Sequence, residues 1–380
     1  MNLDGKLSVF VFLDLYDIYM RIIEETQLDF SDVLIQPKRS TLSSRKEVEI
    51  YRTFTWSNDN GLMRSFTAIP IMAANMGVTG TIDMAKVLSK NGYMCALEKH
   101  YAATEISSLF EELQQDAMHE DKDPCEYTQR VFMTIGINDS FDAIREVKKE
   151  HHLTGAVIDI ANGYQLKLID KVKEVRNEFP ELFIVVGNVV TEDVTTDLIL
   201  AGANCLKIGI GSGAACTTRL KTGVGRPQLS AIIDCADAAH QLHAYVMSDG
   251  GCTVPSDICK AFCAGADFVM LGGMLAGCDE AGGETFEENG KKFKQYYGMS
   301  SKYAQEKHFG KFNSYRASEG RTKLIPATGP LIDTIEDING SIRSCCTYIG
   351  SHNIKHMAKH ATFYRVNRQL NTIFENCKDF

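Results

Sequence analysis

The chain has 380 residues, of which 44% are apolar and 23% are charged, and its formal net charge is −9. Such values are typical of a folded globular protein and argue against long disordered regions. The negative charge disfavours a nucleic-acid partner bound through bulk positive charge. No stretch approaches the roughly 20 apolar residues of a membrane span, and the apolar run at 9–13 lacks a signal-peptide cleavage site, so the sequence predicts a cytoplasmic protein without a membrane partner.

Residues 1–27 form an extension whose role the sequence does not indicate. Beyond it, short apolar runs alternate with polar, helix-like stretches. The runs, which we expect to be strands, are 68–73, 93–97, 131–137, 156–160, 183–189, 205–210, 244–248 and 268–271. The helices expected between them are 83–91, 140–151, 164–179, 191–201, 227–240 and 256–264. Several of these helices begin near Ser or Thr or end just before Gly, as helix termini commonly do.

Continuous apolar runs suit parallel strands that are buried on both faces. Eight of them in strict alternation with helices predict a (β/α)8 TIM barrel. A doubly wound Rossmann sheet is the alternative, but no G-x-G-x-x-G motif follows the first run. We expect one barrel domain over 28–370 with an N-terminal cap, an active-site flap in a mobile segment around 276–330, and a tail at 371–380.

The chain has twelve cysteines, which raises the question of a metal site. No C-x-x-C pair occurs, however, and Cys252, Cys259 and Cys263 have no histidine at zinc-ligand spacing. Most of the thiols are therefore interpreted as buried side chains in a reducing compartment. Cys216 is the exception, because it follows the sixth run, at the strand end where barrel enzymes hold their catalytic groups. Neighbouring N–H groups or Arg219 would favour its thiolate, so we expect it to be a nucleophile.

Glycine-rich loops follow the last three runs. Gly250-Gly251 and Gly272-Gly273 come after the seventh and eighth, where barrels often bind a phosphate through backbone N–H groups. Asp249 would suit a ribose hydroxyl as a hydrogen-bond acceptor. The loop at 209–219 has three glycines in five residues and predicts a carbonyl-lined turn that can bind a monovalent cation.

The segments 209–225 and 227–231 resemble the IMP dehydrogenase/GMP reductase family. Further matching segments, in order along roughly 28–370, are 28–34, 159–164, 187–191, 248–253, 266–274 and 315–320. Two features resemble the reductase branch. The connection after Lys99-His100-Tyr101 is too short for the regulatory CBS pair of the dehydrogenases, and no long dehydrogenase-type flap precedes 315–320. The stretches 298–300 and 343–348 also resemble the reductases.

The resemblance implies NADPH-dependent reductive deamination of GMP to IMP and ammonia, a step of purine nucleotide salvage, carried out by a homotetramer. It implies that Cys216 attacks purine C2 and forms a thioimidate, while Thr218 and Glu319 relay protons. Two alternatives stay open: an IMP dehydrogenase that lacks regulatory domains, and a catalytically silent nucleotide-binding paralogue that regulates an active partner.

The resemblance also implies binding residues, by matching position. For GMP they are Asp249, Gly250, Gly251, Gly272, Gly273, Gly298, Met299, Ser300, Arg316, Ala317, Ser318 and Gly320. For the nicotinamide cofactor they are Ser44, Arg45, Lys99, Asp159, Ile160, Ala161, Ile210, Gly211, Tyr315, Ser344, Cys345, Cys346 and Thr347, with Arg45 and Lys99 offering positive charge to the NADPH phosphates. For potassium they are the backbone carbonyls of Gly211, Gly213, Cys216 and Arg219.

The chain departs from the family pattern at several positions. Gly77 stands where an Asp is usual, Glu98 replaces a His, and Ser212 replaces a Pro, which we expect to loosen the cation loop. Arg226 replaces a Tyr and is expected to add charge near the phosphate. None of these departures removes Cys216, Thr218 or Glu319, so we expect activity with altered affinities.

Overall fold

The computed structural model describes residues 21–57, 61–309 and 318–367. Eight parallel strands close into a barrel in the order in which they follow one another along the chain. They are β4 (Ile71–Ala73), β5 (Met94–Ala96), β6 (Val131–Ile135), β7 (Gly155–Asp159), β8 (Phe183–Val189), β9 (Cys205–Ile208), β10 (Tyr245–Asp249) and β11 (Phe268–Leu271). The predicted (β/α)8 barrel and all eight of its strands are confirmed.

The first predicted strand, 68–73, is longer than the barrel strand that the structure shows there, β4. The apolar run at 68–73 is divided at Pro70, which has no N–H group to donate to a neighbouring strand. Ala68 ends β3 (Met63–Ala68), which pairs with β2 (Arg52–Ser57) in an antiparallel hairpin, and β4 starts at Ile71. Hydrophobicity alone does not separate these two elements, because Ala68, Ile69 and Ile71 are all buried.

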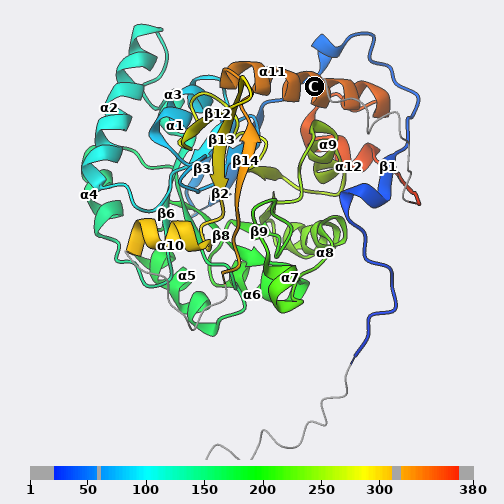
Figure 1. Cartoon of the computed structure of the whole chain (residues 1–380), viewed down its shortest axis with the longest axis horizontal. Helices are drawn as coiled ribbons and strands as arrows, with labels where there is room; N and C mark the ends of the chain where they lie inside the picture. Colours follow the sequence, from blue (N-terminus) through cyan, green and yellow to red (C-terminus); the bar gives the residue numbers. More distant parts are fainter. Residues whose placement is uncertain (1–20, 58–60, 310–317, 368–380) are drawn as a thin grey trace, which may run out of the picture.

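Helices surround the barrel (Figure 1). The six expected ones are confirmed as α1 (Ile82–Lys90), α4 (Asp142–Glu150), α5 (Leu166–Glu178), α6 (Glu192–Leu200), α8 (Gln228–Gln241) and α9 (Pro255–Cys263). Two long helices were not predicted, α2 (Ala103–His119) and α11 (Leu331–Ile349). In α2 the buried residues Ile106, Leu109, Phe110 and Leu113 recur at helical spacing. No helix in the described part of the chain is long and apolar enough to cross a membrane.

Shorter elements complete the chain. The helices are α3 (Cys125–Thr128), α7 (Thr218–Thr222), α10 (Lys302–Phe309), α12 (Met357–His360) and the 3-10 turns η1 (Phe30–Asp32), η2 (Arg45–Glu47) and η3 (Ile354–His356). Strand β1 (Val33–Ile35) pairs antiparallel with β15 (Phe363–Arg365), which joins the first and last described segments.

Aromatic rings of the β2–β3 hairpin close the amino-terminal end of the barrel. Phe54 stacks on Phe268, the first residue of β11, with ring centroids 4.0 Å apart. Trp56 meets Phe183, the first residue of β8, at 5.3 Å. Because the hairpin contacts the residues at which strands begin, the carboxyl ends of the strands are left to form a site.

A three-stranded antiparallel sheet lies within the segment around 276–330 that was expected to be a mobile flap. Its strands are β12 (Thr285–Glu288), β13 (Lys291–Tyr297) and β14 (Thr322–Pro326), with α10 inserted before β14. Figure 1 shows this sheet, in yellow and orange, in front of the barrel strands. Lys294 of β13 donates to the carbonyls of Cys278, Asp279 and Ala281 and so ties the sheet to the chain that follows β11.

A charged cluster fixes the hairpin to the amino-terminal end of the barrel. Asp267, just before β11, accepts from Arg52 of β2 at 2.8 Å and pairs with His240 of α8 at 2.8 Å. The hydrogen bond to Asp267 raises the pKa of His240, and this effect outweighs burial and the nearby Arg52, which lower it.

We expect this histidine to make stability depend on pH. Because its pKa is raised by folding, the contribution of His240 is fully present below its unfolded pKa of about 6.5 and is lost as pH rises through the folded pKa. Between about pH 6 and pH 8 the melting temperature should therefore fall more steeply in the unaltered protein than in His240→Gln. The exposed His119 of α2, replaced in the same way, serves as the control. Parallel melting profiles for the unaltered protein and His240→Gln would contradict this role.

Candidate active site

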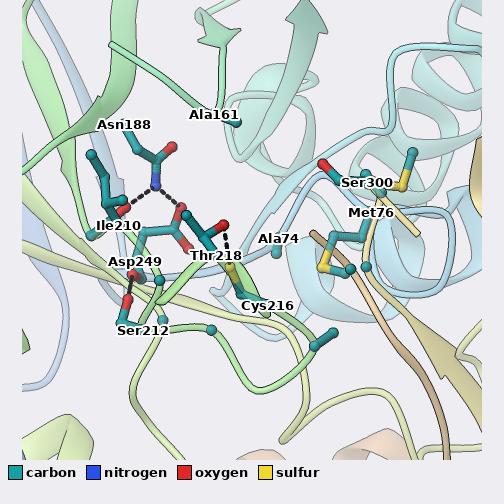
Figure 2. Close-up of a pocket in the computed structure, with 18 of the residues that line it drawn as sticks. Ala74, Met76, Ala161, Asn188, Ile210, Ser212, Cys216, Thr218, Asp249 and Ser300 are labelled. Carbon is teal, nitrogen blue, oxygen red and sulfur yellow. Dashed lines mark hydrogen bonds between the residues drawn. The ribbon is translucent and has the colours of Figure 1, made fainter. Parts of the chain in front are cut away.

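A cavity of about 220 Å³ opens at the carboxyl ends of the barrel strands. Its walls come from the loops after β4, β7, β8, β9 and β10 and from the cover formed by β13 and the segment before β14. Figure 2 shows Cys216 and Thr218 beside Asp249 and Asn188, with Met76 and Ser300 on the other side. The lining residues include Asn75, Met76, Asp159, Asn188, Lys207, Ser212, Cys216, Thr218, Asp249, Tyr296, Met299 and Glu319.

Three of these side chains form a continuous hydrogen-bonded chain. The Cys216 thiol donates to the Thr218 hydroxyl at 3.1 Å, and that hydroxyl donates to Oε2 of Glu319 at 2.6 Å. Each group in the row is therefore aligned to pass a proton to the next. The structure thus brings together the three residues predicted to be catalytic, although they come from two separate parts of the chain.

The position of Glu319 is set by the backbone. The Thr217 N–H donates to the carbonyl of Glu319 at 2.7 Å, and the Arg321 N–H donates to the carbonyl of Ala215 at 3.0 Å. Cys216 and Gly320 accordingly pair as an antiparallel bridge. The loop after β9 and the segment before β14 thus behave as a short two-stranded ladder that carries the nucleophile on one side and the carboxylate on the other.

Glycines allow the loops after β9 and β10 to approach each other closely. Gly209 and Gly250 have φ values of 152° and 86°. A Cβ on Gly209 would lie 2.0 Å from the carbonyl oxygen of Asp249, and one on Gly250 would lie 2.6 Å from Oγ of Ser212. Ser212 in turn donates its hydroxyl to the Asp249 carbonyl at 2.9 Å. This bond fastens the loop that was expected to be loosened by the loss of proline.

A buried lysine that the sequence did not single out joins two of the strand ends. Lys207 of β9 is 2% exposed, and its ammonium group lies 2.5 Å from Asp159 and 3.3 Å from Asp249. Burial alone would lower the pKa of Lys207, but the Asp159 and Asp249 carboxylates outweigh burial and raise it. The clue in the sequence is a charged residue inside an apolar strand, which is rarely tolerated unless it is paired.

Two further residues line the cavity: Asn188, which the sequence placed at a strand end without a role, and Tyr296, which sequence reasoning missed. The Asn188 amide donates to the side chain of Asp249 and to the Gly209 carbonyl, each at 2.8 Å. Tyr296 of β13 is 4% exposed, and burial, with smaller effects of Asp249 and Cys216, raises its pKa. Nothing in the sequence before β13 or within it indicated that this strand faces the site.

The residues expected to bind GMP fall into two groups. Asp249, Gly250, Gly298, Met299, Ser300 and Gly320 line the cavity. Gly272 and Gly273 lie behind Tyr296, Gly251 lies beside Phe30 and Gln228, and the Ser318 hydroxyl donates to the Gly320 carbonyl. Arg316 and Ala317 lie outside the described residues.

The residues expected to bind the cofactor are more dispersed. Asp159, Ala161, Ile210 and Gly211 line the cavity with Cys216, and Ile160 is next to them in sequence. Lys99 borders a separate pocket with Asp139 and Thr134. Arg45, Ser344 and Cys345 line a second large cavity of about 770 Å³, which shares no lining residue with the first. Ser44, Cys346 and Thr347 adjoin these residues in sequence, and Tyr315 lies outside the described residues.

The four residues expected to bind a cation form two neighbouring pairs, Gly211 with Arg219 and Gly213 with Cys216. A Cβ on Gly211 would lie 2.4 Å from the Cγ of Arg219, and one on Gly213 would lie 3.7 Å from the Cβ of Cys216. A set of backbone carbonyls would suit a hard monovalent ion. Two of these carbonyls also accept backbone bonds, that of Gly213 from Cys216 and that of Arg219 from Gly223.

The structure shows which side chains surround two of the residues that depart from the family pattern, Gly77 and Arg226. A Cβ at Gly77 would lie 2.7 Å from the Tyr297 hydroxyl and 3.3 Å from Oε2 of Glu98, so these two side chains occupy the space of a larger residue 77. Arg226 was expected to add charge near the phosphate. Instead its guanidinium binds Asp234, the Val190 carbonyl and Gln27, so its charge is used to hold the N-terminal segment against α8.

Comparison with known proteins agrees with this geometry. Residues 27–372 match the model of the IMP dehydrogenase / GMP reductase domain. A protein named GMP reductase from Klebsiella pneumoniae is 46% identical over 94% of this chain and all of its own length. A protein of the same name from the oomycete Phytophthora infestans is also 46% identical, over 93% of this chain and 94% of its own.

Proposed function

Because the chain belongs to the IMP dehydrogenase / GMP reductase family, we propose that it is a GMP reductase, which converts GMP to IMP and ammonia with a nicotinamide cofactor. The observation that carries this proposal is the row of hydrogen bonds from Cys216 through Thr218 to Glu319. A thiol nucleophile needs a base, and an amine leaving group needs a proton. The row provides both groups within one cavity.

The row suggests the order of proton movements. The Cys216 thiol gives its proton through Thr218 to Glu319 and attacks C2 of the purine as a thiolate. The proton then returns through Thr218 to the departing 2-amino group, which leaves as ammonia, while the sulfur stays bound to C2 as a thioimidate. Once C2 has received the hydride that a nicotinamide cofactor would supply, the C2–S bond breaks, IMP is released, and the Cys216 thiolate takes up a proton from solvent to return to the thiol.

The nucleotide part of GMP would lie against the two glycine loops. We propose that the ribose hydroxyls bind Asp249, which Asn188 and Lys207 hold in place. The N–H groups around Gly250 would face the phosphate, because a backbone without side chains can approach it closely. Met299 and Ser300, at the end of β13, would complete the wall over the base.

The cavity also has side chains suited to the nicotinamide end of a cofactor. Ala161, Ile210 and Met76 give an apolar surface for a flat ring, and Asp159 adds hydrogen-bonding groups. Bound NADPH supplies the hydride that C2 receives. The Arg45–Ser344 pair, joined at 2.8 Å, would bind the phosphate-bearing end of the cofactor in the second cavity. That cavity would belong either to the same copy of the chain or to a neighbouring copy in a homotetramer.

Potassium would be held by the carbonyls of Gly211, Gly213, Cys216 and Arg219.

The test is to follow the purified protein with two pairs of substrates. With GMP and NADPH, we expect the near-ultraviolet absorbance of the reduced nicotinamide to fall while ammonia appears in equal amount. A rise in that absorbance with IMP and NAD⁺, and no reaction with GMP, would identify a dehydrogenase instead. GMP binding by calorimetry with neither reaction would identify a silent nucleotide-binding protein.

Gly250 gives a further prediction about substrate affinity. In Gly250→Ala the new Cβ would crowd the Ser212 hydroxyl at 2.6 Å and the Gly213 nitrogen at 2.8 Å, so the loops must separate and the KM for GMP should rise by about tenfold or more. Gly223→Ala is the matched control, because φ is 74° there but nothing lies within 4 Å. Its backbone strain of about 1 kcal/mol should lower stability and leave the KM unchanged. Equal KM values in the two variants would contradict close packing of these loops.

A further inference from the structure

Three cysteines that the proposed reaction does not use meet where α9 packs against α11. Cys259 and Cys263 lie one turn apart on α9, so both side chains leave the same face of the helix. The Cys259 thiol donates to the carbonyl of Ser341 at 3.8 Å, and Ser341 lies one turn before Cys345 on α11. The side chains of Cys259 and Cys263 both interact with the side chain of Cys345.

The three thiols differ in their access to solvent. Cys259 and Cys263 are buried, whereas Cys345 is half-buried. Cys345 and Cys259 both line the second cavity, next to Arg45 and Ser344. A small molecule that enters this cavity can therefore contact Cys345, the more exposed of the two, while a second thiol lines the same wall.

We propose that Cys345 is a peroxide-reactive thiol that closes a reversible disulfide with Cys259 and so joins α9 to α11. The thiolate of Cys345 attacks one oxygen of hydrogen peroxide, the O–O bond breaks, and the other oxygen leaves as water after taking up a proton. Cys345 is then a sulfenic acid. The sulfur of Cys259 attacks it, the S–S bond forms, and the hydroxyl leaves as a second water with the Cys259 proton. The two sulfurs are oxidised by two electrons in total, and peroxide is reduced to two waters.

The surroundings of Cys345 and Cys259 give these two cysteines different roles in the reaction with peroxide. The neighbouring thiols of Cys259 and Cys263 outweigh burial and lower the pKa of Cys345, which favours the thiolate that attacks peroxide. The interaction with Cys345 and burial both raise the pKa of Cys259, which therefore stays protonated until the sulfenic acid forms. Fully buried cysteines such as Cys95, whose pKa is raised by burial, lack such an arrangement.

A disulfide suits this cluster better than a metal ion does. Within the described part of the chain, three ligand atoms lie close enough to share one ion only at Glu111, Glu150 and His151, so the three cysteine sulfurs are too far apart to do so. Cys345 instead has two alternative partners, each available for a pairwise bond. Cys259 is the partner we assign, because it lines the same cavity as Cys345.

The consequence for activity rests on the proposed function. Ser344, the neighbour of Cys345, accepts from Arg45 at 2.8 Å in the pair proposed to bind the cofactor. An S–S bond is only about 2 Å long, much shorter than the contact distance of two sulfur atoms that are not bonded. Forming it would draw this turn of α11 toward α9 and narrow the cavity. Oxidation should therefore raise the KM for NADPH several-fold, and a dithiol reductant should reverse the change.

The first measurement is independent of any activity. The full-length protein is treated with hydrogen peroxide, digested without reduction and analysed by mass spectrometry. We expect a peptide pair that joins Cys259 to Cys345 and disappears on reduction. Absence of this pair, or a Cys263–Cys345 linkage in its place, would overturn the assignment even if the protein has no GMP reductase activity.

The second measurement links the bond to the cofactor. The KM for NADPH is compared between the oxidised and reduced forms of each protein, so that oxidation of Cys216 is common to all of them. The increase should appear in the unaltered protein and in the matched control Cys263→Ala, and it should be absent in Cys259→Ala. Circular dichroism checks that both variants are folded, and Cys259→Ser serves if the alanine variant is not. An equal increase in Cys259→Ala would show that the disulfide does not control the cavity.

Discussion

Replacement of Cys216 by alanine should lower kcat by at least about 10⁴-fold, because it removes the nucleophile on which the rest of the row acts. GMP binding should be nearly unchanged, since the surrounding contacts come from Asp249, Gly250 and the end of β13. Steady-state turnover and calorimetric titration with GMP measure the two quantities separately. The same change at Cys125, a half-buried cysteine at the start of α3, should leave turnover intact.

Comparison with a Glu319 variant distinguishes the nucleophile from the groups that move its proton. Glu319→Gln keeps the shape of the row but removes the carboxylate that accepts from Thr218 at 2.6 Å. It should lower kcat by about 10²- to 10⁴-fold, a loss typical of general acid–base groups, and still allow the sulfur to react. Turnover in Cys216→Ala close to that of the unaltered protein would rule out the thioimidate.

Replacement of Lys207 by methionine should have the largest effect on stability. The side chain of Lys207 is 3% exposed, and its ammonium contacts both Asp159 and Asp249. Methionine fills much of the same space but leaves two carboxylates without their cation. Because the side chains of Asp159 and Asp249 are 36% and 22% exposed, water replaces part of the lost interaction, and we expect a loss of about 1 to 3 kcal/mol rather than the larger cost of a fully buried charge. Urea unfolding measures this loss. It should be accompanied by a higher KM for GMP, because Asp249 loses a partner.

Two comparisons test the electrostatic explanation. The double variant Lys207→Met with Asp159→Asn removes one of the stranded charges and should regain part of the lost free energy of unfolding. Lys302→Met removes an exposed lysine that lies 3.7 Å from Glu306, and such a surface pair contributes at most about 1 kcal/mol. If the double variant is no more stable than the single one, the loss comes from packing rather than from charge.

The barrel could be predicted from the sequence because each of its strands is a continuous apolar run followed by a helix. The same pattern placed Cys216 at a strand end. Two long helices were missed: α2 occupies the regular place of a helix between β5 and β6, whereas α11 follows the inserted sheet β12–β14 and lies outside the alternation on which the prediction relied. The sheet β12–β14 was missed because its exposed strand β12 and partly exposed β13 have no long apolar run.

The site was predictable only in part, for a related reason. The glycines and Asp249 follow strands directly, so their place at the barrel mouth follows from the fold. Tyr296 reaches the cavity from a separate sheet, and Lys207 is hidden within an apolar run, so neither has a local signal. The tie between Ser212 and Asp249 depends on the distance between two loops, which no local pattern contains.

The short ladder between the Cys216 loop and the segment before β14 connects two properties of the site. One is access to the cavity, and the other is the contact of Thr218 with Glu319, the proton acceptor for Cys216. Thr217 holds the carbonyl of Glu319, and Ala215 accepts from Arg321. Any movement that lifts this segment to admit a nucleotide must therefore break the ladder and carry Glu319 away from Thr218. In such an open form Cys216 would be without its proton acceptor, so the position of this segment would decide whether the thiol is activated. The same coupling would protect the Cys216 thiol in the open form, because a thiol without its base reacts slowly with other molecules that enter the cavity.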